Sequence, residues 1–252
     1  MIISIANQKG GVGKTVTSLN LAAALGRSKK RTLLLDLDPQ GHSTISFMDA
    51  AAVERDVFML FREEIEPREA VHSIEEESID MIPATLSLAK VERDLIAEVD
   101  GHFALKDILD KLRDYYDFII IDTPPALGML TVNCLVASDY ILIPIQASYL
   151  SLEGTDDLLD TIDRIKNRLN PQLEILGALI TIHDRRTVLG KDVVSRIEEV
   201  FGEKVFSTTI GKSVRLEESP AYRESIFRYA PTSQSAQEYM KVCKEVVKRV
   251  SS

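Results

Sequence analysis

Short apolar runs alternate along this chain with longer amphipathic stretches. The short runs are rich in Ile, Leu and Val and show little polar alternation, which is typical of strands that are buried on both faces of a parallel sheet. We predict seven strands from them, at residues 2–6, 32–37, 79–83, 118–121, 140–145, 175–182 and 205–208.

The amphipathic stretches predict helices at residues 15–28, 152–169, 191–201 and 233–250. The second of these should end at Asn170-Pro171, because proline does not continue a helix. Strands that alternate with helices indicate an α/β fold, here a doubly wound, mostly parallel twisted sheet with helices on both faces. Right-handed crossovers in such a fold place a ligand at the C-terminal ends of the strands.

A glycine-rich segment joins the first predicted strand to the first predicted helix. It reads Asn7-Gln8-Lys9-Gly10-Gly11-Val12-Gly13-Lys14-Thr15. Its glycines allow positive φ angles, so that successive N–H groups can surround a phosphate at the positive end of the helix dipole. Lys14 would reach the β- and γ-phosphates, and the Thr15 hydroxyl would ligate Mg²⁺. The segment therefore predicts a P-loop NTPase that binds ATP and Mg²⁺ and hydrolyses the ATP.

The loop departs from the standard pattern GxxxxGK[ST] at its first position. Gln8 stands where that pattern has glycine, and a second lysine, Lys9, adjoins the glycine pair. Lys14 already neutralises the phosphates, so the second cation needs another explanation. Lys9 is either a solvated surface lysine or a group that reaches a phosphate across a subunit interface, and the loop itself leaves both interpretations open.

Carboxylates follow two more of the predicted strands. Asp36 and Asp38 are separated by one residue, and a period of two directs both to the same side, where they could align a water or hold metal-bound waters. The alternative is a helix-capping Asp followed by a turn Asp before Pro39. Asp122 ends an apolar strand, as does the carboxylate that holds the Mg²⁺ shell in the second nucleotide motif. Pro124, in the Thr-Pro-Pro sequence that follows, belongs to a candidate switch near the γ-phosphate.

Length and composition favour one cytoplasmic domain. The 252 residues are 45% apolar and contain no linker or repeat, so we expect a single ATPase domain over residues 1–252. The first apolar run is too short for a signal peptide, and no run has the length of a membrane span. Cys134 and Cys243 form no CxxC pair, which favours two reduced thiols.

The charge is negative overall but unevenly distributed. The formal net charge of −9 argues against a general nucleic-acid binder. Residues 49–110 carry 17 acidic and 6 basic side chains, whereas residues 183–252 carry 10 acidic and 13 basic ones. The C-terminal third therefore presents either a local basic face or ordinary solvated helix surfaces.

The motifs at residues 9–15, 36–41 and 121–125 resemble those of the ParA/Soj family of partition ATPases, which have a deviant Walker A motif and are related to MinD. The resemblance extends to residues 132–139, 149–154, 214–220 and 229–239. Larger plasmid relatives carry an N-terminal helix-turn-helix extension, and we expect none here.

This resemblance implies an ATP-driven dimer. Two protomers would meet face to face with the nucleotides between them, and Lys9 would contact the phosphates of the partner's ATP. Asp38 would orient the attacking water, so that Lys9, Lys14 and Asp38 are the catalytic candidates, while Thr15, Asp36 and Asp122 would serve the magnesium. The implied nucleotide-binding residues are Lys9, Gly10, Gly11, Val12, Gly13, Lys14, Thr15, Val16, Pro124 and Gly211.

The resemblance also implies partners. The ATP dimer would bind DNA without sequence preference on the nucleoid, and a ParB-like protein would stimulate hydrolysis during chromosome or plasmid segregation or cargo positioning. The candidate DNA-binding residues are Arg185, Arg186, Lys212, Arg215 and Arg223. Contacts of these side chains with phosphates would give salt-sensitive affinity.

Two departures from the family pattern bear on the nucleotide. Val16 replaces a threonine, which removes a hydroxyl near the α-phosphate, and Gly211-Lys212 replaces Pro-Arg in a segment that lies near the adenine in relatives. We expect ATP binding to survive both changes in a looser pocket.

Two related classes provide alternatives. A membrane-cycling regulator like MinD needs a C-terminal amphipathic anchor. Residues 238–250 are amphipathic but poor in aromatic residues and leucine, which favours core packing and no stable membrane association. The iron–sulfur reductase branch needs paired cluster cysteines, and neither Cys134 nor Cys243 matches the required positions.

Overall fold

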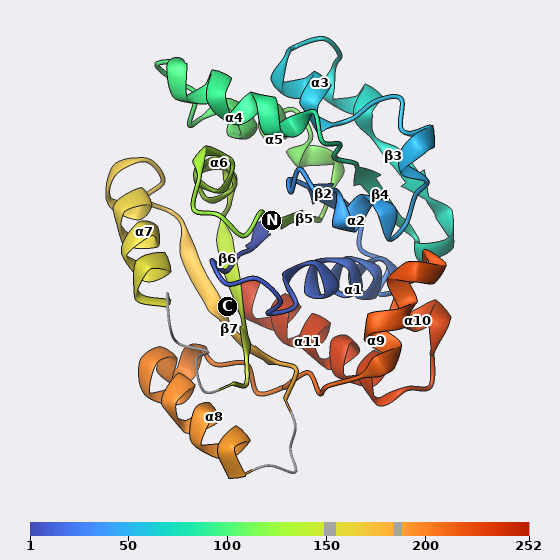
Figure 1. The fold of residues 1–252 in the computed structure, drawn as a ribbon, viewed down its shortest axis with the longest axis vertical. Helices are drawn as coiled ribbons and strands as arrows, with labels where there is room; N and C mark the ends of the chain where they lie inside the picture. The colour runs from blue at the N-terminus through green and yellow to red at the C-terminus, as the bar shows by residue number, and fades with distance from the viewer. Residues whose placement is uncertain (149–154, 184–187, 252) are drawn as a thin grey trace.

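One seven-stranded sheet organises the molecule (Figure 1). The computed structural model describes residues 1–148, 155–183 and 188–251. The strand order is β3-β4-β2-β5-β1-β6-β7, and all neighbours are parallel except the edge pair β3–β4. The strands are β1 (Ile2–Ile5), β2 (Thr32–Asp36), β3 (His72–Ile74), β4 (Ile79–Ile82), β5 (Phe118–Asp122), β6 (Tyr140–Gln146) and β7 (Glu174–Thr181).

Both faces of the sheet are covered because successive strand residues point to opposite sides. Leu34 and Ile120 pack into a cluster with helices α1 (Lys14–Arg27) and α11 (Gln234–Val250), whereas Leu33 and Ile119 pack into a second cluster on the other face. The helices of the second cluster are α3 (Val57–Phe61), α4 (Leu88–Ala97), α5 (Ala104–Asp110) and α6 (Met129–Ala137). A third cluster joins α6 with α7 (Thr155–Arg168) and α8 (Val188–Phe201) beside β6 and β7.

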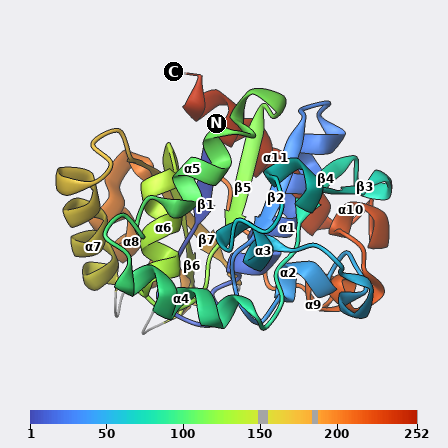
Figure 2. The same ribbon diagram turned by 90° about the horizontal axis from the view of Figure 1, so that it is seen from above.

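The connections of the sheet reverse direction between β1 and β5. From β1 the chain passes through α1 to β2, whereas from β5 it passes through α6 to β6 on the far side of β1. A crevice at such a switch point, at the C-terminal ends of the strands, is where doubly wound folds bind ligands. Both chain ends lie at the opposite end of the sheet (Figure 2). The glycine-rich loop that follows β1 is therefore placed in the crevice.

The predicted doubly wound α/β fold is confirmed, with differences in individual elements. The strand predicted at residues 205–208 is wrong, because Val205 forms only an isolated bridge with Ala178. Arg249 explains the difference, since its guanidinium donates to the carbonyls of Lys204 and Val205, which would otherwise serve a strand partner. The short edge strand β3 and the helices α4, α5 and α6 were not predicted.

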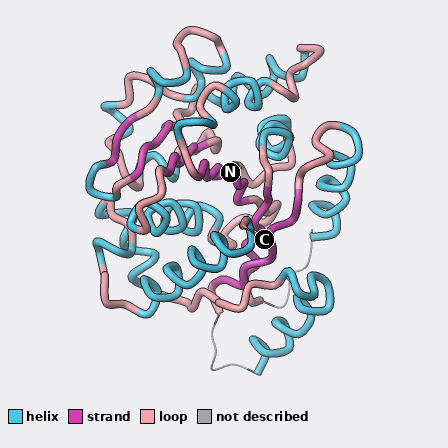
Figure 3. The backbone as a smooth tube through the Cα atoms, turned by 180° about the vertical axis from the view of Figure 1, so that it is seen from behind, coloured by secondary structure: helices cyan, strands magenta, loops and turns pink. Residues whose placement is uncertain are grey.

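The C-terminal helix packs into the core, as its composition predicted. Tyr239, Val242, Cys243 and Val246 of α11 are buried in the cluster that includes α1. Figure 3 shows the two long helices together on that face of the sheet. Among the described residues, no helix combines the length and the apolar content that crossing a membrane requires.

Three short helices complete the site region. α2 (His42–Ile45) follows β2, and α9 (Val214–Glu218) and α10 (Ile226–Tyr229) precede α11. The turn before α10 is anchored over a long sequence separation, because Asn20 of α1 accepts a hydrogen bond from the N–H of Ile226 and the buried Glu77 accepts two from Ser225. The C-terminal segment is thus fixed to the helix that follows the glycine-rich loop.

Candidate nucleotide site

The glycine-rich loop is held open between the sheet and the start of α1. Gly11 and Gly13 adopt positive φ angles of 74° and 84°, which favour glycine. Asn7 ties the loop to β6, because its side chain donates to the carbonyl of Pro144 and accepts from the N–H of Lys9. Thr181 of β7 donates to the carbonyl of Val12 across 2.8 Å. Hydrogen bonds to the surrounding sheet therefore fix the shape of the loop.

Lys14 is buried at the first turn of α1, and its amine lies inside the loop. The Nζ atom donates to the carbonyl of Lys9 at 3.2 Å. Burial lowers the pKa of Lys14, while the nearby carboxylates of Asp122 and Asp38 act in the opposite direction. Lys14, Asp38 and Asp122 are thus brought together at one edge of the sheet.

Asp36 and Asp122 are register partners on the neighbouring strands β2 and β5, and both are fully buried. Asp122 accepts hydrogen bonds from Ser18 at 3.0 Å and Ser43 at 2.8 Å, and the Thr15 hydroxyl is a further partner. Burial raises the pKa of both carboxyls, and Asp122 raises that of Asp36 further. Two carboxylates held this close out of water favour a cation beside them.

Asp36 and Asp38 also shape the chain that follows β2. Asp36 accepts from the N–H of Asp38 and from both the N–H and the hydroxyl of Thr44 in α2. Asp38 accepts from the N–H of Gln40. Asp38 thus has the turn role of the alternative interpretation, whereas the N-cap of α2 is Gly41, which forms no side-chain cap, and Asp36 reaches the third residue of that helix from the end of β2. Asp38 also lies near Lys14.

The donor set around Asp122 fits magnesium. Mg²⁺ prefers oxygen ligands and keeps several waters, usually binding through one or two carboxylates and the phosphates of a substrate. Thr15 and the two buried aspartates supply oxygen donors of this kind next to the glycine-rich loop. The described residues contain no group of three His, Cys, Asp or Glu side chains that could form a protein-only metal cage.

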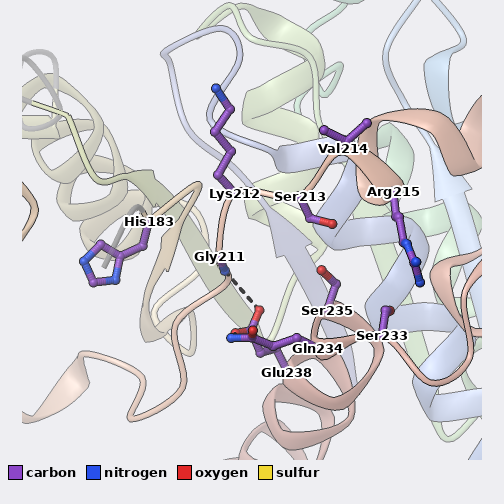
Figure 4. Close-up of a pocket in the computed structure, with 10 residues that line it drawn as sticks. All are labelled: His183, Gly211, Lys212, Ser213, Val214, Arg215, Ser233, Gln234, Ser235 and Glu238. Carbon is purple, nitrogen blue, oxygen red and sulfur yellow. Dashed lines mark hydrogen bonds between the residues drawn. The ribbon is translucent and has the colours of Figure 1, made fainter. Parts of the chain in front are cut away.

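Gly211 lies beside the glycine-rich loop, although the two are far apart in sequence. Gly13, Val16 and Gly211 line a small cavity of about 80 Å³, whose wall also includes Thr181 and Tyr239. The N–H of Gly211 donates to the buried carboxylate of Glu238 on α11 at 3.0 Å, as the dashed line in Figure 4 shows. The cavity therefore joins the segment around Gly211 to the glycine-rich loop and the start of α1.

The candidate DNA-binding residues do not all gather in one place. Lys212 and Arg215 are exposed and line a pocket of about 720 Å³ next to Gly211, in which the Lys212 side chain points away from Glu238 (Figure 4). Arg223 forms an ion pair with Asp49 at 3.5 Å and lines a different pocket, with Thr15 and His42. Arg185 and Arg186 lie outside the described residues, as does the segment 149–154.

Several polar residues of the site were missed by sequence reasoning. They are Asn7, Ser18, Ser43, Thr44 and Glu238. Ser18 had a usable signal, because it stands one helical turn after Lys14 on the buried side of α1. Glu238 had no local signal, since its partner Gly211 is 27 residues away along the chain.

Comparisons with known proteins agree with this geometry. An AAA domain family matches residues 1–175. The sporulation initiation inhibitor protein Soj of Bacillus subtilis is 42% identical over 246 residues, which are 97% of each chain. The chromosome-partitioning ATPase Soj of Thermus thermophilus is 42% identical over 98% of this chain and 96% of its own. The solved structure of cobyrinic acid a,c-diamide synthase from Mycobacterium smegmatis, with bound ATP analog and magnesium, has a TM-score of 0.90 and 32% identity over 100% of this chain and 95% of that one.

Proposed function

The chain belongs to the ParA/Soj family of partition ATPases, and from this premise we propose that its ATP-bound form is a DNA-binding dimer that works in chromosome or plasmid partition. The chain is an ATPase whose cofactor is Mg²⁺. The assignment follows the Soj proteins because their identity of 42% exceeds the 32% of the Mycobacterium smegmatis protein.

The observation that carries the proposal is the convergence of Lys14, Asp38 and Asp122 at the loop after β1. Phosphoryl transfer depends mainly on positioning and on charge stabilisation around the phosphates. Lys14 would exchange the carbonyl of Lys9 for phosphate oxygens, and the N–H groups of the loop would hold the remaining oxygens. Asp38, close to Lys14, would orient the water that attacks the γ-phosphate.

Magnesium would be held by Thr15 and, directly or through waters, by Asp122 and Asp36. The ion would supply positive charge at the β- and γ-phosphates during transfer. The hydroxyls of Ser18 and Ser43 donate to the Asp122 carboxylate and so fix its orientation. We assign Ser18 and Ser43 as positioning residues.

Lys9 is the residue on which the dimer depends in this proposal. The main chain of Lys9 forms hydrogen bonds within its own protomer. Its N–H donates to the side chain of Asn7, and its carbonyl accepts from the amine of Lys14. The side chain is half-buried, and the resemblance to the ParA/Soj family implies that the amine at this position contacts the partner's nucleotide. We therefore assign the Lys9 amine to the phosphates of the ATP bound by a second copy, which would make the complete site a product of two protomers.

DNA binding is assigned to Lys212 and Arg215, which are exposed next to the cavity at Gly211. Dimerisation would double a weak basic patch and so raise its affinity for a polyanion. A ParB-like partner would stimulate hydrolysis and release the DNA, in the cytoplasm and on the nucleoid. The MinD-like alternative would require the apolar side of α11 to insert into a membrane, but that side packs in the core.

A mobility shift with random-sequence duplex DNA tests the proposal. The protein is incubated with ATP and Mg²⁺, with ADP and Mg²⁺, or without nucleotide. We expect the duplex to be retarded in the presence of ATP and Mg²⁺ and not in the other two conditions. Equal retardation in all three conditions would contradict the claim that DNA binding depends on the bound nucleotide. Absence of retardation in all three would contradict the claim that the protein binds DNA.

A further inference from the structure

Two segments that lie far apart in the sequence together carry five lysines at the surface of this acidic protein. Lys29 and Lys30 follow α1, and Lys241, Lys244 and Lys248 lie on α11. We call this set the lysine face.

Contacts at the end of α1 bring the two segments together. The Oγ atom of Ser28 lies 3.8 Å from the Sγ atom of Cys243 and 3.9 Å from the Sδ atom of Met240. Lys30 and Lys244 both lie close enough to Cys243 to act on the pKa of its thiol. The end of α1 and the middle of α11 therefore form one continuous surface, and Figures 1 and 3 show the two helices together.

The three lysines of α11 lie on the side of the helix that faces away from the core. Positions 241, 244 and 248 are spaced by three and four residues, which places them on one side of a helix. Val242, Cys243 and Val246 on the other side are buried. At 1.5 Å of rise per residue the lysine row is about 10 Å long. The row is exposed and contributes nothing to the core.

The acidic residues of the same helix are engaged elsewhere. Glu245 accepts from Arg249 and from the N–H and hydroxyl of Ser207, and Glu238 is buried at Gly211. Within the part of the chain that the structure describes, Lys29, Lys30, Lys241 and Lys244 form no salt bridge. The exposed Glu75 and Glu76 lie at the border, on a short turn that packs against α1. The face therefore keeps a positive charge in a chain of net charge −9.

The helix that carries the row is rigidly attached to the sheet. Arg249 donates to the carbonyls of Leu176, Lys204 and Val205 at 2.8 to 2.9 Å, and its guanidinium lies over the ring of Phe206. These contacts fix the end of α11 beside β7. Substitutions on the outer row leave this anchor intact, so their effects can be separated from unfolding.

We propose that the lysine face binds the phosphate backbone of duplex DNA, as a second contact surface beside Lys212 and Arg215. This inference rests on the proposed DNA-binding function. Lysines on a helix surface provide charge without reading bases, as sequence-independent DNA binding requires. An anionic membrane is a poorer match, because an interfacial helix inserts bulky apolar residues. None of the large exposed hydrophobic side chains in the described residues belongs to α11.

The test compares two charge-reversed double variants. Lys241→Glu/Lys244→Glu changes the lysine face, and Arg164→Glu/Lys166→Glu reverses the same number of charges on the exposed side of α7. Anisotropy of a labelled random-sequence duplex is measured with ATP and Mg²⁺ across a salt series. We expect the first variant to bind at least about tenfold more weakly, with a slope of log K against log salt that is smaller by about 2, and the second to stay within about twofold of the parent.

Equal DNA affinity of the two double variants would overturn the claim that the lysine face binds DNA. If the parent protein itself does not bind DNA, the proposed DNA-binding function is overturned instead. A lysine-face variant that keeps DNA binding but loses binding to phosphatidylglycerol vesicles also overturns the inference, in favour of a membrane. Binding of a fluorescent ATP analogue confirms folding, and Lys241→Gln/Lys244→Gln replaces the first variant if the glutamates prevent folding.

Discussion

The Nζ atom of Lys14 donates a hydrogen bond to the main-chain carbonyl of Lys9, 3.2 Å away, so the two lysines of the glycine-rich loop are joined through the main chain of one and the side chain of the other. Lys14 is directed inward and is nearly fully buried, while Lys9 is only half-buried. This difference separates a lysine that serves its own nucleotide from one that we assign to a second protomer.

Lys14→Ala should weaken binding of ATP and ADP by about tenfold or more. A hydrogen bond to a charged group contributes about 1.5–3 kcal/mol, and the buried amine of Lys14 lies inside the loop. Titration with a fluorescent ADP analogue measures the change. Lys106→Ala removes an exposed lysine of α5 and should bind as the parent does. Unchanged affinity of Lys14→Ala would place the phosphates elsewhere.

Asp38→Asn should keep ATP binding and slow hydrolysis by about a hundredfold or more, because loss of a positioned base costs 10²–10⁴ in rate. Asparagine retains the side-chain oxygen that accepts from the N–H of Gln40, so the turn after β2 is preserved. Phosphate release under saturating ATP measures the rate. Hydrolysis close to that of the parent would show that another group handles the water.

The sequence predicted the core of the site because its motifs are local. The glycine-rich loop, Asp36 and Asp122 each stand at the end of an apolar run, and the parallel sheet brings those ends to one edge. Ser18 and Ser43 were missed because they reach Asp122 over 104 and 79 residues, which no short pattern encodes. The strand predicted at 205–208 failed for the same reason, since Arg249 competes for its backbone from 44 residues away.

Charge counting alone did not distinguish a basic face from ordinary helix surfaces in the C-terminal third. The structure resolves this at the level of single residues. Arg223 is paired with Asp49, and Arg249 binds main-chain carbonyls inside the fold. Lys241 and Lys244 are exposed, and Lys244 and Lys30 both lie near Cys243. Tertiary contacts decide which basic side chains are exposed to bind a ligand, and the amino-acid composition does not reveal those contacts.

Glu77 should make stability depend on pH. Burial raises its pKa above the ordinary 4.5, and the opposing effects of Ser225, Arg228 and Arg27 do not cancel the increase. The folded chain then binds the proton more tightly than the unfolded chain. The stability contributed by protonated Glu77 is complete below pH 4.5 and is lost as the pH rises through the raised pKa of the folded state.

Glu77→Gln removes this titration and keeps an oxygen acceptor for the N–H of Ser225. As the pH rises from acid toward neutrality, the parent loses the contribution of protonated Glu77 and the variant does not. The free energy of unfolding of the variant minus that of the parent should therefore increase with pH. Urea unfolding over a pH series measures the difference between the two proteins. A difference that stays constant or shrinks with rising pH would contradict the assigned shift.

Arg215→Glu should abolish retardation of random-sequence duplex DNA in ATP and leave nucleotide binding unchanged. Arg215 is exposed at the rim of the pocket beside Gly211, so the reversal repels phosphates without disturbing the core. Arg168→Glu on α7 is the matched control and should shift the duplex as the parent does. Equal retardation by Arg215→Glu and its control would move the DNA surface away from α9.

The claim that the complete site needs two protomers is tested most directly by light scattering of Asp38→Asn and of Lys9→Ala/Asp38→Asn in saturating ATP and Mg²⁺. Slow hydrolysis in both proteins keeps ATP in place during the measurement. We predict a mass of about twice 28.1 kDa for Asp38→Asn and of 28.1 kDa for the double variant. A dimer of undiminished stability in the double variant would contradict the claim and leave Lys9 as a surface charge.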